Sequence, residues 1–87
     1  MDKKTEIITI LQEECAELVV AGSKILRFGS PVNELDFIQE MADVLTLIHI
    51  AREEFNITEE DLKPRIDKKL SKLNVFSNII DSEDDHA

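Results

Sequence analysis

The sequence predicts an all-α protein, an antiparallel bundle of three main helices that is completed by oligomerisation. Apolar residues recur at helical spacing over most of the chain, and turn-forming residues are few, with two Gly and two Pro among 87 residues. Trp and Tyr, which favour sheets, are absent. A chain of this length makes one small domain, which we place at residues 1–80 and expect to depend on further copies of itself.

The first helix is predicted from Lys4 to Phe28. Its apolar positions follow the helical repeat: Ile7, Ile8, Ile10, Leu11, Ala16, Leu18, Val19, Ala21, Ile25, Leu26 and Phe28. Gly22 interrupts this pattern at a cost of about 1 kcal/mol relative to Ala. Gly22 therefore indicates either close packing against a neighbour or a bend.

The second helix is predicted from about Glu34 to Phe55. Gly29 suits the position just after a helix, and Ser30 or Asn33 can cap the next one. The apolar residues of this second segment cover more than one face of the helix, so the helix must be buried on several sides. Three helices alone cannot do this, which predicts that the segment lies in a dimer core.

The third helix is predicted to begin after Thr58, where Thr58 and Asp61 have the spacing of a capping box. Pro64 is expected to break or kink it, leaving a main segment that ends near Phe76. Five of the ten basic residues of the chain fall here: Lys63, Arg65, Lys68, Lys69 and Lys72. They form either a solvated face that pairs with acids or a cationic wall that faces a polyphosphate. Residues 81–87 are acidic and poor in apolar side chains, which predicts a disordered tail.

The charge balance limits the partners. A net charge of −9 argues against nucleic-acid binding, because a phosphate backbone would repel the protein. The N-terminus lacks the apolar core of a signal peptide, and no apolar run approaches the length of a membrane-spanning helix. We therefore expect a soluble cytoplasmic protein that does not bind membranes. The single cysteine, Cys15, cannot form an intrachain disulfide and is interpreted as a packing residue.

Two pairs of carboxylates have a spacing that metal chemistry can use. Glu14 and Glu17 lie three residues apart on the first helix, as do Glu40 and Asp43 on the second, and Glu13 joins Glu17 at four residues. On adjacent antiparallel helices the two pairs would form an all-oxygen cage suited to Mg²⁺, with Mn²⁺ as an alternative. The competing interpretation is coincidence, since 19 acidic residues in 87 produce such pairs on ordinary helix surfaces.

Two cations follow the first acidic pair. Lys24 lies seven residues past Glu17, nearly on the same face of the helix, and Arg27 lies one turn further on. They are candidates for binding phosphate groups, or else cations that complement the dipole at the end of the helix.

These motifs resemble a known family. The run Glu13-Glu14-Cys15-Ala16-Glu17-Leu18, followed by Glu40-Met41-Ala42-Asp43-Val44-Leu45, is similar to the MazG-like all-α nucleoside triphosphate pyrophosphohydrolases. Ser23-Lys24 and Arg27-Phe28-Gly29 resemble the short, single-domain members of that family in phages and bacteria. The likeness covers residues 5 to 80 approximately.

The resemblance implies Mg²⁺-dependent cleavage of a (deoxy)nucleoside triphosphate to the monophosphate and pyrophosphate. It assigns the metal ligands to Glu14, Glu17, Glu40 and Asp43. Glu13 would be an accessory acid that, with Glu17, acts on the attacking water. Lys69 and Lys72 would join Lys24 and Arg27 in substrate binding. Family members work as dimers or tetramers.

Two other functions fit the same sequence. One is phosphoribosyl-ATP pyrophosphohydrolase, which shares the acidic helices. The other is a non-catalytic acidic oligomer that serves as an interaction or regulatory module, with its carboxylates simply solvated.

Overall fold

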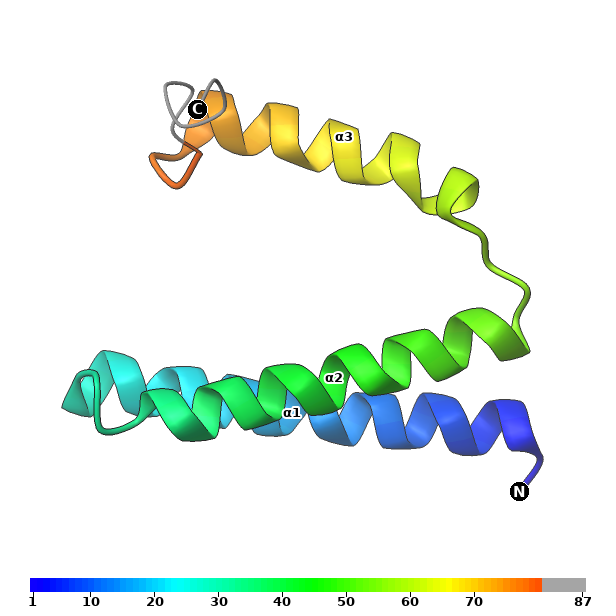
Figure 1. The fold of residues 1–87 in the computed structure, drawn as a ribbon, viewed down its shortest axis with the longest axis horizontal. Helices are drawn as coiled ribbons and strands as arrows, with labels where there is room; N and C mark the ends of the chain where they lie inside the picture. Colours follow the sequence, from blue (N-terminus) through cyan, green and yellow to red (C-terminus); the bar gives the residue numbers. More distant parts are fainter. Residues whose placement is uncertain (81–87) are drawn as a thin grey trace. The chain divides into compact units, whose positions relative to one another are not determined.

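The computed structural model describes residues 1–80, which form three helices and no strands: α1 (Lys3–Phe28), α2 (Glu34–Glu54) and α3 (Glu59–Phe76) (Figure 1). The all-α prediction is confirmed. The described chain divides into two compact units, residues 1–56 and a second unit that begins at Ile57. The single domain predicted over residues 1–80 stays a prediction, and the predicted tail at 81–87 lies outside the described residues.

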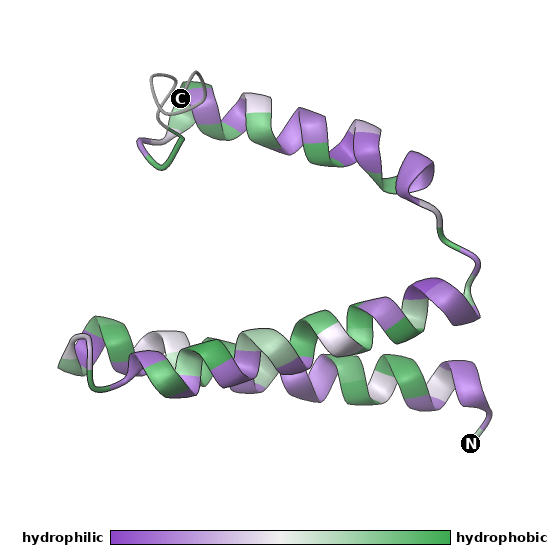
Figure 2. Ribbon diagram, viewed as in Figure 1, coloured by the Kyte–Doolittle hydropathy of each residue, from purple (hydrophilic) through white to green (hydrophobic). Residues whose placement is uncertain are grey.

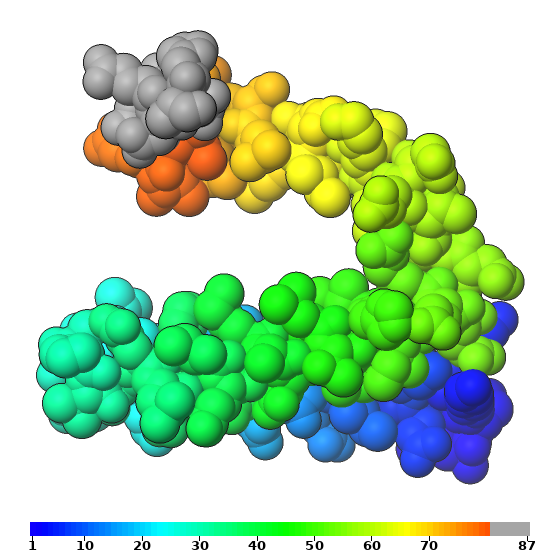
Figure 3. Space-filling view, viewed as in Figure 1, coloured from blue at the N-terminus to red at the C-terminus, as the bar shows by residue number. Residues whose placement is uncertain are grey.

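The first unit is a hairpin of two antiparallel helices. α1 and α2 pack against each other along their length, as the space-filling view shows (Figure 3). Asp2 caps α1, because its Oδ1 accepts a hydrogen bond of 2.8 Å from the backbone N–H of Thr5. At the open end of the hairpin, Lys3 Nζ lies 3.2 Å from Glu54 Oε1 and the Lys4 ammonium lies 5.2 Å from the centre of the Phe55 ring.

Five residues connect the two helices. Gly29 ends α1 with φ +85° and ψ 167°, a backbone conformation open essentially to glycine alone, and its N–H donates to the Ile25 carbonyl at 2.8 Å. Asn33 occupies the N-cap position of α2, but its side chain does not cap that helix. Its Nδ2 instead donates to the Gly29 carbonyl at 3.0 Å, which ties the two ends of the connection together.

Little apolar surface is buried within the described chain. Only Ile7, Ala21 and Val44 are buried apolar residues in the part that the structure describes. Gly22 faces Phe37, where a Cβ would stand 3.6 Å from Phe37 Cε1, an ordinary contact distance that leaves room for a methyl group.

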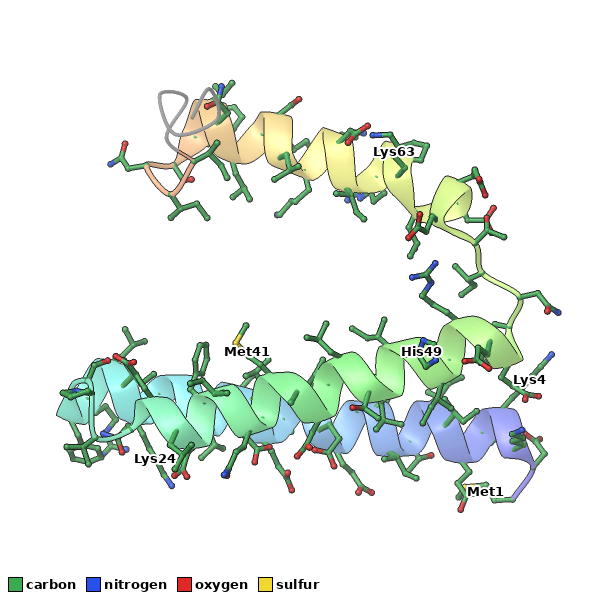
Figure 4. The ribbon with its side chains drawn as sticks, viewed as in Figure 1. Met1, Lys4, Lys24, Met41, His49 and Lys63 are labelled. Carbon is green, nitrogen blue, oxygen red and sulfur yellow. The ribbon has the colours of Figure 1, made fainter. Side chains whose placement is uncertain are left out.

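Apolar colours extend over outward parts of the hairpin (Figure 2), and the Met41 side chain points away from α1 (Figure 4). Four large apolar residues recur at helical spacing along α2 and are 39–63% exposed: Ile38, Met41, Leu45 and Ile48. We call these four residues the α2 apolar stripe.

α3 belongs to the second unit and begins with the predicted capping box. The Asp61 N–H donates to Thr58 Oγ1 at 3.2 Å, and the Thr58 N–H donates to Asp61 Oδ2 at 2.8 Å. Pro64 does not break the helix, which continues from Glu59 to Phe76 with Pro64 inside it, so the predicted break is wrong and the alternative, a kink, stays a prediction. Pro64 lies early in the helix, so its ring removes a single backbone hydrogen bond, the one to Glu60, while the residues on either side remain helical.

No helix in the described part of the chain has a stretch long and apolar enough to cross a lipid bilayer.

Candidate metal centre and adjoining cleft

Three carboxylates meet between α1 and α2. Glu14 comes from α1, whereas Glu40 and Asp43 come from α2, and one oxygen of each lies within 4.8 Å of the others. The three-residue spacing places Glu40 and Asp43 on one side of α2, and the antiparallel pairing brings Glu14 opposite them. We call these three residues the acidic cluster.

The cluster lies partly out of solvent. Glu14 and Glu40 are half-buried, while Asp43 is exposed. Oε2 of Glu14 and Oε2 of Glu40 are each shielded from solvent without a hydrogen-bond partner. A shielded carboxylate oxygen without a donor is costly, because it has lost the hydrogen bonds that water would supply. Each of these two oxygens can therefore still accept a proton or bind a cation.

Electrostatics agree with this geometry. Loss of solvent is the main cause that raises the pKa of Glu14, and the nearby charges of Glu17 and Asp43 raise it further. The pKa of Glu40 is also raised, first by loss of solvent and then by interaction with the Glu17 carboxyl group. Both groups are thus harder to ionise than an ordinary glutamate, and a cation placed among them would reverse that effect.

The other two predicted acids lie beside the cluster. Glu17 is exposed, yet its charge raises the pKa of both Glu14 and Glu40, so it lies close to each of them. Glu13 is exposed and makes a smaller contribution to the raised pKa of Glu14. The structure therefore brings the four predicted metal ligands into one neighbourhood, with Glu17 at its edge. Their role as ligands stays a prediction.

A cleft of about 310 Å³ adjoins Glu17 and Glu40. Its lining comes from both helices of the hairpin: Glu17, Val20, Ala21 and Lys24 of α1, and Asp36 and Glu40 of α2. Such a volume lies near the lower end of the range for small-molecule sites, about 300–1,000 Å³. The cleft combines an apolar wall with charges of both signs.

The predicted substrate-binding cations fall into different places. Lys24 lines the cleft, near the end of the hairpin that carries the connection between the helices (Figure 4). Arg27 is not part of the cleft lining, and its guanidinium lies 5.1 Å from the centre of the Phe28 ring. Lys69 and Lys72 have exposed side chains on α3, in the second unit, and their role in substrate binding stays a prediction.

Asp36 was not predicted as a site residue. It lies four residues before Glu40 and seven before Asp43, so the three acids share one face of α2. The prediction for this helix paired only Glu40 with Asp43, three residues apart, and gave Asp36 no role. The repeat of acids at positions 36, 40 and 43 was the signal that could have revealed Asp36.

The chain was compared with protein-family models, curated protein sequences and solved structures. None of them matches. The likeness to MazG-like pyrophosphohydrolases therefore stays an expectation, and a function has to be inferred from the residues of this chain.

The donor set fits a hard divalent cation. All of its atoms are carboxylate oxygens, which Mg²⁺ and Mn²⁺ prefer, and the described residues place no His or Cys among them. Two shielded oxygens without partners and a spacing within 4.8 Å would suit ions that also retain bound waters. Exposed acidic groups also occur together without a metal. It is therefore the two shielded oxygens, and not the number of acids, that favour a cation site here.

Proposed function

We propose that this protein is a Mg²⁺-dependent nucleoside triphosphate pyrophosphohydrolase, a hydrolase that cleaves a (d)NTP to the (d)NMP and pyrophosphate. One observation carries the proposal, namely that Glu14 and Glu40, from different helices, each hold a shielded oxygen without a partner, and that Glu40 also lines the cleft that contains Lys24. A merely solvated acidic surface would turn these oxygens toward water.

Glu14, Glu40 and Asp43 would hold the metal, with Glu17 as a fourth ligand from the edge of the cluster. When bound, Mg²⁺ would neutralise charge on the phosphate oxygens of the substrate. The raised pKa values of Glu14 and Glu40 support this assignment, because both carboxyl groups gain most from a nearby positive charge.

The remaining residues of the site have separable roles. Lys24 would bind a phosphate oxygen through its ammonium group, since it lines the same cleft as Glu17 and Glu40. Glu17, with Glu13 as an accessory acid, would accept a proton from the attacking water at a carboxylate oxygen. The water oxygen forms a bond to phosphorus as the bridging bond between the α and β phosphates breaks. Arg27, Lys69 and Lys72 remain candidates for the outer phosphates.

We further propose that the protein is a helical bundle completed by a homodimer or homotetramer. The support is the α2 apolar stripe, whose most exposed member, Leu45, has 63% of its surface accessible. Large apolar side chains exposed along one face of a helix favour packing against a partner. Isologous packing of two copies would cover the same stripe on both.

The direct test is to incubate the purified protein with each NTP and dNTP in the presence of Mg²⁺ and to identify the products by anion-exchange chromatography. Monophosphate and pyrophosphate in equal amounts are expected, with loss of turnover on chelation by EDTA and recovery on adding Mg²⁺. Glu40→Gln should lose activity, whereas Glu59→Gln, which removes an exposed acid from α3, should retain it.

Two results would count against the proposal. Diphosphate and orthophosphate would indicate a different cleavage position. An absence of turnover with every nucleotide, together with no effect of Mg²⁺ on stability, would favour a non-catalytic helical oligomer.

A further inference from the structure

We propose that Asp36 recognises the nucleoside part of the substrate by accepting a hydrogen bond from a ribose hydroxyl or from an exocyclic amino group of the base. This inference rests on the proposed function, because it names a second region of the same site. It concerns a residue that lines the cleft but lies outside the acidic cluster.

The position of Asp36 along α2 separates it from the cluster. Asp36 lies four positions before Glu40, which is about 6 Å along the helix axis at 1.5 Å per residue. It lies seven positions before Asp43, or about 10.5 Å. Asp36 therefore extends the charged face of α2 by one turn toward the connection between the helices.

The cleft joins the two regions. Glu17 and Glu40 line it at the cluster end, and Asp36, Lys24, Val20 and Ala21 complete its wall. A triphosphate held at the cluster end would place the sugar and base further along this cleft. Val20 and Ala21 offer that part an apolar surface, which suits a sugar or a base better than a phosphate.

Charge decides which part of a nucleotide Asp36 can face. A carboxylate accepts hydrogen bonds but donates none when ionised, and it repels phosphate oxygens. Neutral groups with hydrogen-bond donors are its natural partners, and the nucleoside carries them as sugar hydroxyls and base amino groups. Carboxylates bind both kinds of group in other proteins.

Asp36 is also available for such a contact. Although Asp36 and Lys24 line the same cleft and carry opposite charges, they form no ion pair with each other in the described chain. The side chain of Asp36 is exposed, so a ligand can reach it. The competing explanation is that Asp36 only complements the helix dipole, since it lies in the first turn of α2.

Glu34 supplies a matched control. It is an exposed acid in the same first turn of α2, and it is absent from the cleft lining. Asp36→Asn and Glu34→Gln both remove one negative charge near the N-terminus of α2. A dipole effect would appear in both variants, whereas a contact with the nucleoside would appear only in Asp36→Asn.

The test measures binding by calorimetry with Mg²⁺ and two probes, an α,β-methylene nucleoside triphosphate and inorganic tripolyphosphate. Asp36→Asn should weaken binding of the nucleotide analogue roughly 10- to 100-fold, the range for a hydrogen bond to a charged group, and leave tripolyphosphate binding unchanged. Glu34→Gln should change neither. Comparing ribo, deoxy and dideoxy analogues, and cytosine with uracil, assigns the lost contact to the sugar or to the base.

Other results would overturn the inference. Equal weakening of both probes would place Asp36 at the phosphate or metal end, and wild-type affinity for the nucleotide in Asp36→Asn would leave it no role in recognition. The proposed function fails in a different way, because wild-type protein would then bind neither probe and turn over no nucleotide. That outcome would remove both.

Discussion

A carboxylate oxygen of Glu14 on α1 and one of Glu40 on α2 lie within 4.8 Å of each other, and each residue has an oxygen that is shielded from solvent without a hydrogen-bond partner. In the metal-free protein this relationship opposes folding, because both groups lose solvent and approach other negative charges. With a divalent cation it becomes a binding site. The acidic cluster should therefore destabilise the fold when it is ionised and metal-free, and stabilise it when a cation is bound or the carboxyl groups are protonated.

Mg²⁺ should stabilise the fold. A ligand that binds only the native state raises the melting temperature, by about 5–10 °C for a chain of this size when its concentration is ten times the dissociation constant. The double variant Glu17→Gln, Asp43→Asn should lose this rise in thermal melts followed by circular dichroism. Glu59→Gln, Glu60→Gln removes two exposed acids from α3 and should keep it. An identical response in both double variants would exclude the cluster as the binding site.

Glu14 and Glu40 should contribute to the stability of the metal-free protein with a pH dependence opposite in sign to that of ordinary ion-paired acids. The folded-state pKa values of Glu14 and Glu40 lie above the ordinary value of 4.5. Their protonated forms therefore favour folding below pH 4.5, and this contribution is lost as pH rises through the raised pKa values.

Glu14→Gln or Glu40→Gln should remove the loss of stability that the replaced carboxyl group causes as pH rises. At pH 7 in EDTA each variant should be as stable as the wild type or more stable. The difference in stability between variant and wild type should be smallest at pH 4, where the wild-type carboxyl group is protonated. Melting temperatures across this interval provide the measurement. A marked loss of helicity at pH 7 would instead show that the ionised side chain supports the structure.

The two glycines should respond oppositely to replacement by alanine. At Gly22 a Cβ fits at an ordinary distance of 3.6 Å from Phe37 Cε1, so Gly22→Ala should stabilise the protein by up to about 1 kcal/mol through helix propensity. At Gly29 space is open, but φ is +85°, so Gly29→Ala should destabilise it by about 1–3 kcal/mol. Urea unfolding of the two variants checks both signs. A destabilised Gly22→Ala would mean that Phe37 cannot accommodate the added methyl group.

The α2 apolar stripe should control assembly. Leu45→Asp places a charge at a position that is 63% exposed in the single chain, so it should dissociate an oligomer or prevent folding that depends on one. Light scattering should give a multiple of the 9.9 kDa chain mass for the wild type and a lower mass for the variant. Gln39→Asp, which adds the same charge at another exposed position of α2, should assemble normally. A folded wild-type monomer would contradict the prediction.

The sequence was a good guide to helices and a partial guide to the site. The periodic apolar residues and the turn at Gly29 predicted α1 and α2 to within one residue, and Thr58 with Asp61 predicted the start of α3. Pro64 was misjudged, because one missing backbone hydrogen bond near the start of a helix does not interrupt it.

Within the site, the angle between two residues around the helix axis distinguishes the predicted cation that lines the cleft from the one that does not. Lys24 lies about 20° from Glu17 in helical projection and lines the cleft, whereas Arg27 lies about 80° away and does not. The burial of one oxygen on Glu14 and on Glu40 depends on how closely the two helices approach. Side-chain spacing within a single helix carries no information about that distance. Neither the shielding of these two oxygens nor the existence of the cleft could therefore be derived from it.

Because the connection between Phe28 and Glu34 has only five residues, the number of residues from Glu17 to Glu40 sets the register in which the two helices pair. Inserting or deleting one residue in the helical segments between Glu17 and Glu40 would rotate one side of the cluster by about 100° relative to the other, without any change to the acids themselves. Length changes after Asn56 leave all four predicted ligands in place. Homologous chains should therefore tolerate insertions and deletions far more readily beyond Asn56 than between Glu17 and Glu40.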